Sequence, residues 1–281
     1  MKSGKAPGHD EVHAEILKTL EEEDLDAVTS LFNKIYTTGV IPEDWLKSTF
    51  VPIPKKSSAK RCEEFRTISL MSHVLKLFLK IIHGRIYRKC EEQISDTQLG
   101  FRGGLGTRDA LFAIQVLVQR CLDMNKDVFL CFIDYEKAFD RVQHEKMIQI
   151  LQQVGLDSRD VRIIANLYWN QKAHVRFSDN TSEDVEIRRG VRQGCVLSPL
   201  LFNLYSDLML RRCRGSESFR YEDMEIGHDL MTSSSWDPPT LNFSGLSLCC
   251  NICRSRDVDQ LGKMEAGDVR YPPRHLCIKR R

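Results

Sequence analysis

The stretch Phe129-Leu-Cys-Phe-Ile-Asp-Tyr-Glu-Lys-Ala-Phe-Asp140 decides the fold. Its apolar first half predicts a strand over residues 127–135 that is buried on both faces. The strand ends in acid, with Asp134 followed by Glu136 and Asp140. A carboxylate at the end of a buried strand is costly unless a cation or hydrogen-bond donors match it, and oxygen ligands suit Mg²⁺. Asp134 is therefore a candidate metal ligand, with an acid satisfied by local donors as the alternative, and we expect Asp140 to cap the next helix.

Periodic segments surround this strand. Apolar residues at helical spacing predict helices, and two prolines make Ser48–Pro54 extended. Alternating apolar residues around the turn at 178–182 predict a β-hairpin. The predicted helices cover residues 10–23, 24–36, 68–91, 107–118, 145–154, 157–170 and 198–210, and the predicted hairpin covers 174–189.

Composition sets the class of protein. The 281 residues allow one large domain or two ordinary ones, and 42% hydrophobic with 28% charged residues excludes wholesale disorder. No run approaches the ~18–20 apolar residues of a membrane span, and no apolar N-terminal signal is present. We expect an intracellular chain that does not enter a membrane, with its ten cysteines reduced.

Charge is informative only locally. The net charge is +2, but residues 65–90 hold six basic residues and no acidic one. Such a segment is typical of a phosphate-facing surface, and a solvated helix face is the alternative.

Six blocks, in order, resemble the motifs of reverse transcriptases of the non-LTR retrotransposon (LINE) type. The stretch 129–140 resembles the first catalytic motif, and Gly190-Val-Arg-Gln-Gly-Cys-Val-Leu-Ser-Pro-Leu-Leu-Phe-Asn203 resembles the motif that contacts template and nucleotide. The remaining blocks are Lys2–Asp10, Val51–Lys55, Glu64–Leu70, and Gln98–Arg102 with Thr107–Asp109. The resemblance covers about residues 1–210.

The resemblance implies an α/β (α+β) fold of the right-hand polymerase kind. Fingers would occupy residues 1–115 and part of a palm residues 116–210. An unrelated tail, expected to be disordered, would follow at 211–281. The implied activity is RNA-directed DNA polymerisation by two-metal phosphoryl transfer, with an RNA template, a DNA primer and dNTP as partners.

The resemblance also implies roles for single residues. Asp134 and the carbonyl of Tyr135 would hold Mg²⁺. Phe139 would be the steric gate that excludes a ribose 2′-hydroxyl, with a core phenylalanine as the alternative, and Ala138 would leave room for the nucleotide. The remaining positions are Lys55 and Arg66 on the triphosphate, Gln193 and Gly194 beside nucleotide and template, and Lys76, Lys80, Arg85, Arg88 and Lys89 near template or primer phosphates.

The chain departs from the family after this last motif. The aromatic-Ala-Asp-Asp hairpin of the second catalytic block is missing, and the nearest string is Tyr221-Glu-Asp-Met224. We therefore expect catalysis to be lost in this chain. The alternatives are a non-catalytic nucleic-acid-binding remnant and a decayed element without function. The tail has a spacing of possible ligands that approaches that of a zinc site, formed by Cys249, Cys250 and Cys253 with His275 and Cys277. The alternative is that these cysteines are incidental.

Overall fold

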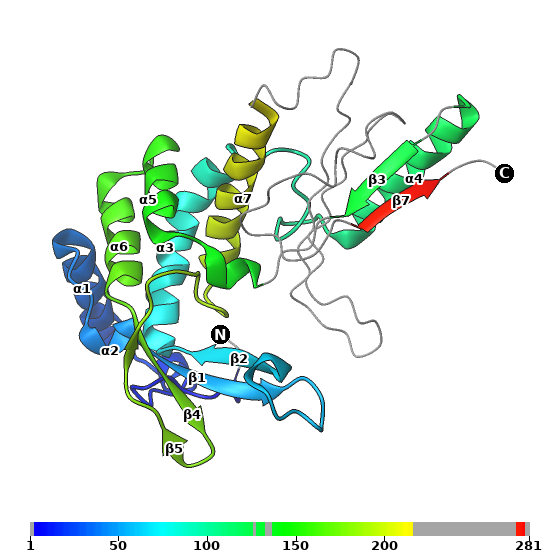
Figure 1. Cartoon of the computed structure of the whole chain (residues 1–281). Coiled ribbons are helices and arrows are strands. Elements are labelled where there is room, and N and C mark those ends of the chain that lie inside the picture. The colour runs from blue at the N-terminus through cyan, green and yellow to red at the C-terminus, as the bar shows by residue number, and fades with distance from the viewer. Residues whose placement is uncertain (1–2, 126–127, 133–136, 216–273, 279–281) are drawn as a thin grey trace. The chain divides into compact units, whose positions relative to one another are not determined.

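The computed structural model describes residues 3–125, 128–132, 137–215 and 274–278 (Figure 1). They belong to two compact units, Met1–Gln93 with Phe139–Tyr205 and Ile94–Ala138 with Ser206–Arg281. The units interleave along the chain, since each is built from two separate segments. The assignment of 1–115 to fingers and 116–210 to a partial palm therefore stays a prediction.

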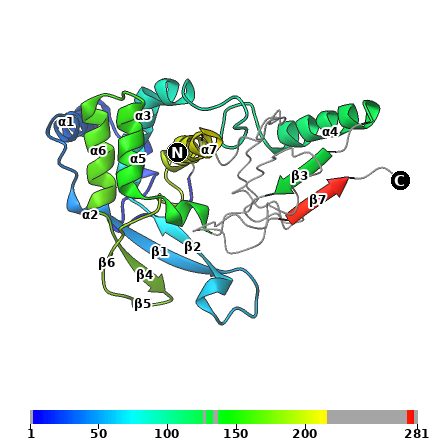
Figure 2. The ribbon, with the colours of Figure 1, turned by 45° about the horizontal axis from the view of Figure 1, so that its top comes forward.

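Four helices dominate the first unit: α1 (Glu22–Thr38), α3 (His73–Glu91), α5 (His144–Gln153) and α6 (Ser158–Trp169) (Figure 2). The predictions of helices at 24–36, 145–154 and 157–170 are confirmed to within two residues at each end. Gly39 ends α1 in the left-handed region at φ 78°, and the Asp157 carboxylate caps α6 by accepting from the Arg159 N–H at 2.8 Å. The fully buried side chains that form this core include Phe78, Leu79, Ile82, Leu151, Ile164 and Leu167.

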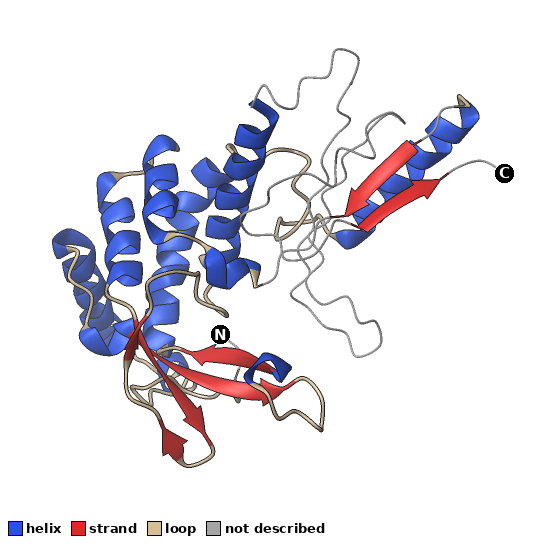
Figure 3. Ribbon diagram, viewed as in Figure 1, coloured by secondary structure: helices blue, strands red, loops and turns tan. Residues whose placement is uncertain are grey.

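A sheet lies below these helices in the view of Figure 3. Its strands are β1 (Lys47–Pro54), β2 (Phe65–Leu70), β4 (Lys172–Phe177), β5 (Asn180–Thr181) and β6 (Val185–Glu186), in the order β2-β1-β4-β5 with β6 also on β4. β1 pairs antiparallel with β2 and parallel with β4, and only Lys47–Phe50 of β1 meet β4. Pro52 and Pro54 lie beyond that part, so their missing N–H groups cost no bond to β4. The predicted extended segment and hairpin are confirmed.

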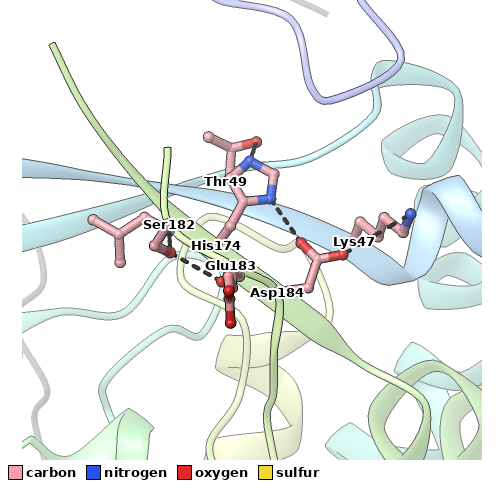
Figure 4. Close-up of polar contacts among 7 residues, drawn as sticks. Lys47, Thr49, His174, Ser182, Glu183 and Asp184 are labelled. Carbon is pink, nitrogen blue, oxygen red and sulfur yellow. Dashed lines mark hydrogen bonds and ion pairs between the residues drawn. The ribbon is translucent and has the colours of Figure 1, made fainter. Parts of the chain in front are cut away.

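A set of polar contacts links β1 to the hairpin that begins with β4 (Figure 4). The buried His174 ring has Nε2 2.9 Å from the Thr49 hydroxyl and Nδ1 3.2 Å from an Asp184 carboxylate oxygen. Lys47 Nζ lies 4.0 Å from the other oxygen of Asp184. Because both ring nitrogens have partners, the imidazole can be buried at little cost.

The predicted helix over 10–23 is wrong. The structure has only a 3-10 turn there, η1 (Ile16–Lys18), and Glu11 has a positive φ of 54°. The segment is instead held by distant groups: His73 Nδ1 lies 2.9 Å from the Val12 carbonyl, and a side chain at Gly8 would collide with the backbone of Met71 and Ser72. These contacts outweigh the local helical pattern.

The helix predicted over 68–91 begins too early. Residues 65–70 form β2, and α3 begins after Ser72, whose hydroxyl caps it by accepting from the Leu75 N–H at 3.1 Å. Pairing with β1 places Ile68 opposite Val51, so residues 68–70, which the apolar periodicity assigned to the helix, belong to strand β2 instead.

The second unit contains α4 (Thr107–Asp123), β3 (Val128–Phe132) and β7 (Arg274–Ile278). β3 forms the described part of the strand predicted at 127–135, and it pairs antiparallel with β7, with Leu130 opposite Leu276. The predicted tail thus holds one strand among the described residues. Helix α7 (Ser198–Gly215) runs five residues past the predicted end at Leu210. Among the described helices, none is long and apolar enough to cross a membrane.

Candidate functional site

Two segments far apart in the sequence are joined in the first unit. They are residues 139–144, which include the end of the stretch 129–140, and residues 190–195, which begin the stretch 190–203. The Val191 N–H donates to the Phe139 carbonyl at 2.8 Å, and the Gly190 N–H donates to the Val142 carbonyl at 2.7 Å. Gly190 has φ +94°, and a Cβ there would lie 3.0 Å from the Asp140 backbone. Only glycine meets both requirements, so the close approach explains this residue.

Side chains add two bonds across the same junction. Gln193 Nε2 donates to a carboxylate oxygen of Asp140 at 3.3 Å, and His144 Nε2 lies 2.8 Å from the Gly190 carbonyl. Burial lowers the pKa of His144, which favours the neutral ring donating to that carbonyl. The expectation that Asp140 caps the next helix is wrong, because α5 begins after Gln143 and the Asp140 carboxylate faces Gln193 instead.

The structure places Phe139 in the 3-10 helix η3 (Ala138–Arg141), where its ring is half-buried. The Phe202 ring of α7 lies 4.8 Å away between centroids. This packing holds the Phe139 ring and accounts for an aromatic residue here without a nucleotide. Its role as a steric gate, and the role of Ala138, stay predictions.

The loop that holds Gly194 lies beside the end of β2 and the start of α3, where Lys76 is located. Gly194 has φ +85°, and the Ser69 carbonyl of β2 is 3.9 Å from the position that its Cβ would take. Lys76, one helical turn into α3, is half-buried, and burial lowers its pKa while nearby Asp10 acts in the opposite direction. The loop 193–195 therefore has the end of β2 and the start of α3 as neighbours.

Lys55 and Arg66 come together at the far end of the β1–β2 hairpin. Pro54 pairs with Phe65, and the Lys55 N–H donates to the Glu64 carbonyl at 2.8 Å. Lys55 Nζ also donates to the Glu63 carbonyl at 3.1 Å. Arg66 lies three residues along β2 from Ser69, a distance of about 10 Å. The hairpin thus carries two exposed basic side chains on the part that lies away from Ser69, the residue beside Gly194.

The basic residues of α3 do not share one face. At about 100° per residue, Lys76 and Lys80 lie on one flank of the buried face, and Arg85 and Lys89 lie on the other. Arg85 binds the buried carboxylate of Asp160 at 3.3 Å and the Tyr36 hydroxyl at 2.8 Å.

The two neighbouring basic residues are engaged as well. Lys89 Nζ donates to the Gly155 carbonyl, and Arg88 pairs with Glu92 at 3.1 Å. These contacts account for Arg85, Arg88 and Lys89 without a nucleic acid, and the phosphate-binding role of the five basic residues stays a prediction.

Sequence reasoning missed Arg192, the most deeply placed charge of the site. Its side chain is 2% exposed, and its guanidinium donates to the carbonyls of Trp45, Leu46 and Leu167. Those carbonyls end α2 (Glu43–Leu46) and lie near the end of α6. Nothing in the motif Gly-Val-Arg-Gln-Gly marks its arginine as buried, because the three acceptors come from remote segments.

The predicted metal ligands Asp134 and Tyr135 lie outside the described residues, as do Tyr221–Met224 and the cysteines of the tail from Cys249 to Cys253. Within the described part of the chain, no group of three or more His, Cys, Asp or Glu residues could hold a metal ion. Oxygen donors such as the Asp134 carboxylate and the Tyr135 carbonyl suit Mg²⁺ by their chemistry.

Comparisons with known proteins agree with this arrangement. Residues 53–226 match the family model described as "Reverse transcriptase (RNA-dependent DNA polymerase)". The chain is 30% identical over 203 residues to the Pol polyprotein of the type-1 retrotransposable element R2 of Nasonia vitripennis, covering 72% of this chain and 20% of that protein. It is 30% identical over 207 residues to the probable RNA-directed DNA polymerase of the Drosophila melanogaster transposon X-element, covering 73% and 23%. The chain thus spans about a fifth of the length of these curated relatives.

Solved structures show the same fold. Apo telomerase from Candida tropicalis, truncated from its C-terminal domain, superposes with a TM-score of 0.56 at 13% identity over 91% of this chain and 55% of that one. Telomerase from Candida albicans, in complex with a fragment of telomeric RNA, gives 0.58 at 11% identity over 89% and 45%. The family match covers more than half of the chain and includes both joined segments. The chain belongs to the reverse transcriptase family, as a reverse transcriptase domain of the non-LTR retrotransposon type.

Proposed function

We propose that this chain is the nucleotide- and hybrid-binding part of an RNA-directed DNA polymerase and that it does not polymerise on its own. The observation that carries the proposal is the junction of residues 139–142 with residues 190–193. It joins the block that follows Asp134 to the block that holds Gln193. Both blocks belong to the polymerase motifs, and their direct bonding supports one shared site.

In this proposal the incoming dNTP lies against the junction. Gln193 and Gly194 contact the nucleotide and template, and the absent side chain of Gly194 permits close approach. Phe139 excludes a 2′-hydroxyl by collision, and Ala138 leaves room for the sugar. Lys55 and Arg66 hold the triphosphate, since both are exposed cations on the β1–β2 hairpin, whose strand β2 also passes beside Gly194.

Asp134 and the Tyr135 carbonyl would hold Mg²⁺. When bound, the metal supplies activation of the primer 3′-hydroxyl and charge stabilisation of the leaving pyrophosphate. The printed 281 residues contain no aromatic-Ala-Asp-Asp block, so the site has one carboxylate where the family has more. Loss of one electrostatic group that acts in the transition state commonly costs ~10²–10³ in rate, and loss of a shared metal ligand costs more.

Primer extension tests the catalytic half of the proposal. The full chain is incubated with a DNA primer on an RNA template, all four dNTPs, and Mg²⁺ or Mn²⁺. We expect no extension product with either metal. Extension that Asp134→Ala abolishes would show that the chain polymerises, and extension that survives Asp134→Ala would identify a contaminating polymerase.

Binding of an RNA–DNA hybrid without catalysis is the second candidate, and exposed Lys80 on the flank of Lys76 favours it. Binding through phosphates weakens steeply with salt. We expect salt-dependent affinity for a fluorescent hybrid that Asp134→Ala leaves intact. Absence of binding together with broad, non-cooperative melting would favour a decayed element instead.

A further inference from the structure

Arg192 is a buried cation that is held by backbone oxygens. Its Nη1 donates to the Trp45 carbonyl at 3.1 Å, and its Nη2 donates to the carbonyls of Leu46 at 3.4 Å and Leu167 at 3.2 Å. A buried charge is expensive unless it is hydrogen-bonded, and here the two Nη groups of the arginine fork are bonded while its Nε has no partner among the described residues. The fork therefore fixes the position of its own backbone relative to α2 and α6.

The backbone of Arg192 is fixed from the other side as well. Its carbonyl accepts from the Ser198 hydroxyl at 2.6 Å, and Ser198 also lies 3.4 Å from the hydroxyl of fully buried Tyr168. The Cys195 N–H donates to the same carbonyl at 3.2 Å. Arg192 thus joins the turn 192–195 to the start of α7 and to the helices that its side chain reaches.

The neighbours of Arg192 face the proposed site. Val191 bonds to Phe139 through its backbone, and Gln193 bonds to Asp140 through its side chain. A shift of Arg192 would move both, because each of them is joined directly to it by a peptide bond. Side chains that act at a polymerase site must be held within about 0.5 Å, which requires such support.

We infer that Arg192 is a positioning residue: its clamp on the carbonyls of Trp45, Leu46 and Leu167 holds Gln193 and Gly194 in register with the Phe139–Asp140 segment. The inference rests on the proposed nucleotide site for its purpose. The geometric part, a local latch on residues 190–195, can be tested without any ligand.

Amide hydrogen exchange of the full chain tests the latch. The Gly190 and Val191 amides are the reporters, since both bond across the junction, and core amides of α3 and α6 are the controls. We expect Arg192→Met to speed exchange at the reporters about tenfold or more, which corresponds to ~1.4 kcal/mol of local opening, and to leave the controls unchanged at native conditions. Arg192→Lys, which keeps the charge but loses the fork, should give an intermediate increase.

Unchanged reporters, or reporters and controls that rise by the same factor, would overturn the inference, since the residue would then support only global stability. Where Arg192→Met fails to fold, Ser198→Ala provides the second variant, because it removes the hydroxyl bond to the Arg192 carbonyl without unpairing a buried charge. It should accelerate the same two reporters selectively.

Ligand binding then separates this inference from the proposed function. The probe is dNTP binding to the chain on an RNA template–DNA primer duplex, for the single variants Arg192→Met and Gln193→Ala and for the double variant. We expect Gln193→Ala to weaken binding in the natural chain but to add less than about twofold to Arg192→Met, the non-additivity of coupled residues. If the unsubstituted chain binds no dNTP, the proposed function fails while the exchange data still decide the latch. If binding is present and the two effects multiply, the positioning role fails alone.

Discussion

Substitution of Arg85 tests whether this basic residue of α3 stabilises the fold or binds nucleic acid. Its guanidinium contacts the Asp160 carboxylate at 3.3 Å and the Tyr36 hydroxyl at 2.8 Å, and it lies 4.8 Å from the centroid of the Tyr36 ring. The Asp160 side chain is only 6% exposed, whereas that of Arg85 is 50% exposed. We therefore expect Arg85→Ala to act mainly by leaving Asp160 buried without its cation.

The magnitude follows from these exposures. The ion pair is half solvated and contributes ~0.5–1 kcal/mol. The hydrogen bond to Tyr36 contributes about 1 kcal/mol, and the unpaired Asp160 carboxylate adds a penalty of about 1 kcal/mol. Because these effects overlap, we expect ~2 kcal/mol in all, or a fall in Tm of ~4–8 °C for a chain of this size.

The assay compares three alanine variants by thermal melting and by the affinity for a fluorescent RNA–DNA hybrid at several salt concentrations. Arg85→Ala should lower Tm and change affinity less than about twofold, while Lys80→Ala should keep Tm and reduce the salt slope by about one phosphate contact. Lys146→Ala, an exposed lysine of α5, is the control for loss of charge. The reasoning is refuted if Arg85→Ala keeps Tm and weakens hybrid binding as much as Lys80→Ala does.

Three further predictions test local parts of the fold. An ion pair with Lys56 and backbone N–H bonds lower the pKa of Glu64 from 4.5 to about 2. Its carboxylate therefore stabilises the folded chain above pH 4.5, and this stability is lost as the pH falls toward 2. We expect Glu64→Gln to lower Tm at pH 7 and to have no effect on Tm near pH 2. Gly190→Ala should cost more than Gly194→Ala in urea melts, because both residues have positive φ (~1–2 kcal/mol each) but only at Gly190 would Cβ press on the Asp140 backbone, at 3.0 Å; equal costs would contradict this. Ser72→Ala should cost ~1 kcal/mol by removing the cap of α3, and Ser72→Asp should recover most of it.

Helices with a continuous apolar face could be predicted from sequence, because their periodicity agrees with their final packing. This holds for α1, α5 and α6, whose ends are also marked by Gly39 and Asp157. The failures occur where distant contacts override the local pattern. Residues 10–23 have helical spacing, yet Glu11 turns the chain and His73 holds Val12, and neither contact has a signal within the segment.

The site divides in the same way. The resemblance to the family's motifs implied that Phe139, Gln193 and Gly194 belong to one site, and the structure joins their segments by backbone bonds. The resemblance could not identify the partner of Asp140, because Gln193 lies 53 residues away in the sequence. Nor could it identify His144, which bonds to a carbonyl 46 residues away.

The residues of the motif Gly190–Cys195 differ in burial, and this difference separates those that anchor the turn from those that are accessible. Arg192 and Cys195 are buried, and burial raises the pKa of the Cys195 thiol, which makes it a neutral packing group and not a nucleophile. Between them, Gln193 is half-buried and Gly194 is exposed. A turn whose two flanking side chains are anchored inward must present the pair between them outward. The buried arginine and cysteine therefore support the accessible glutamine and glycine, and a substitution at either anchor should disturb the site without touching a ligand.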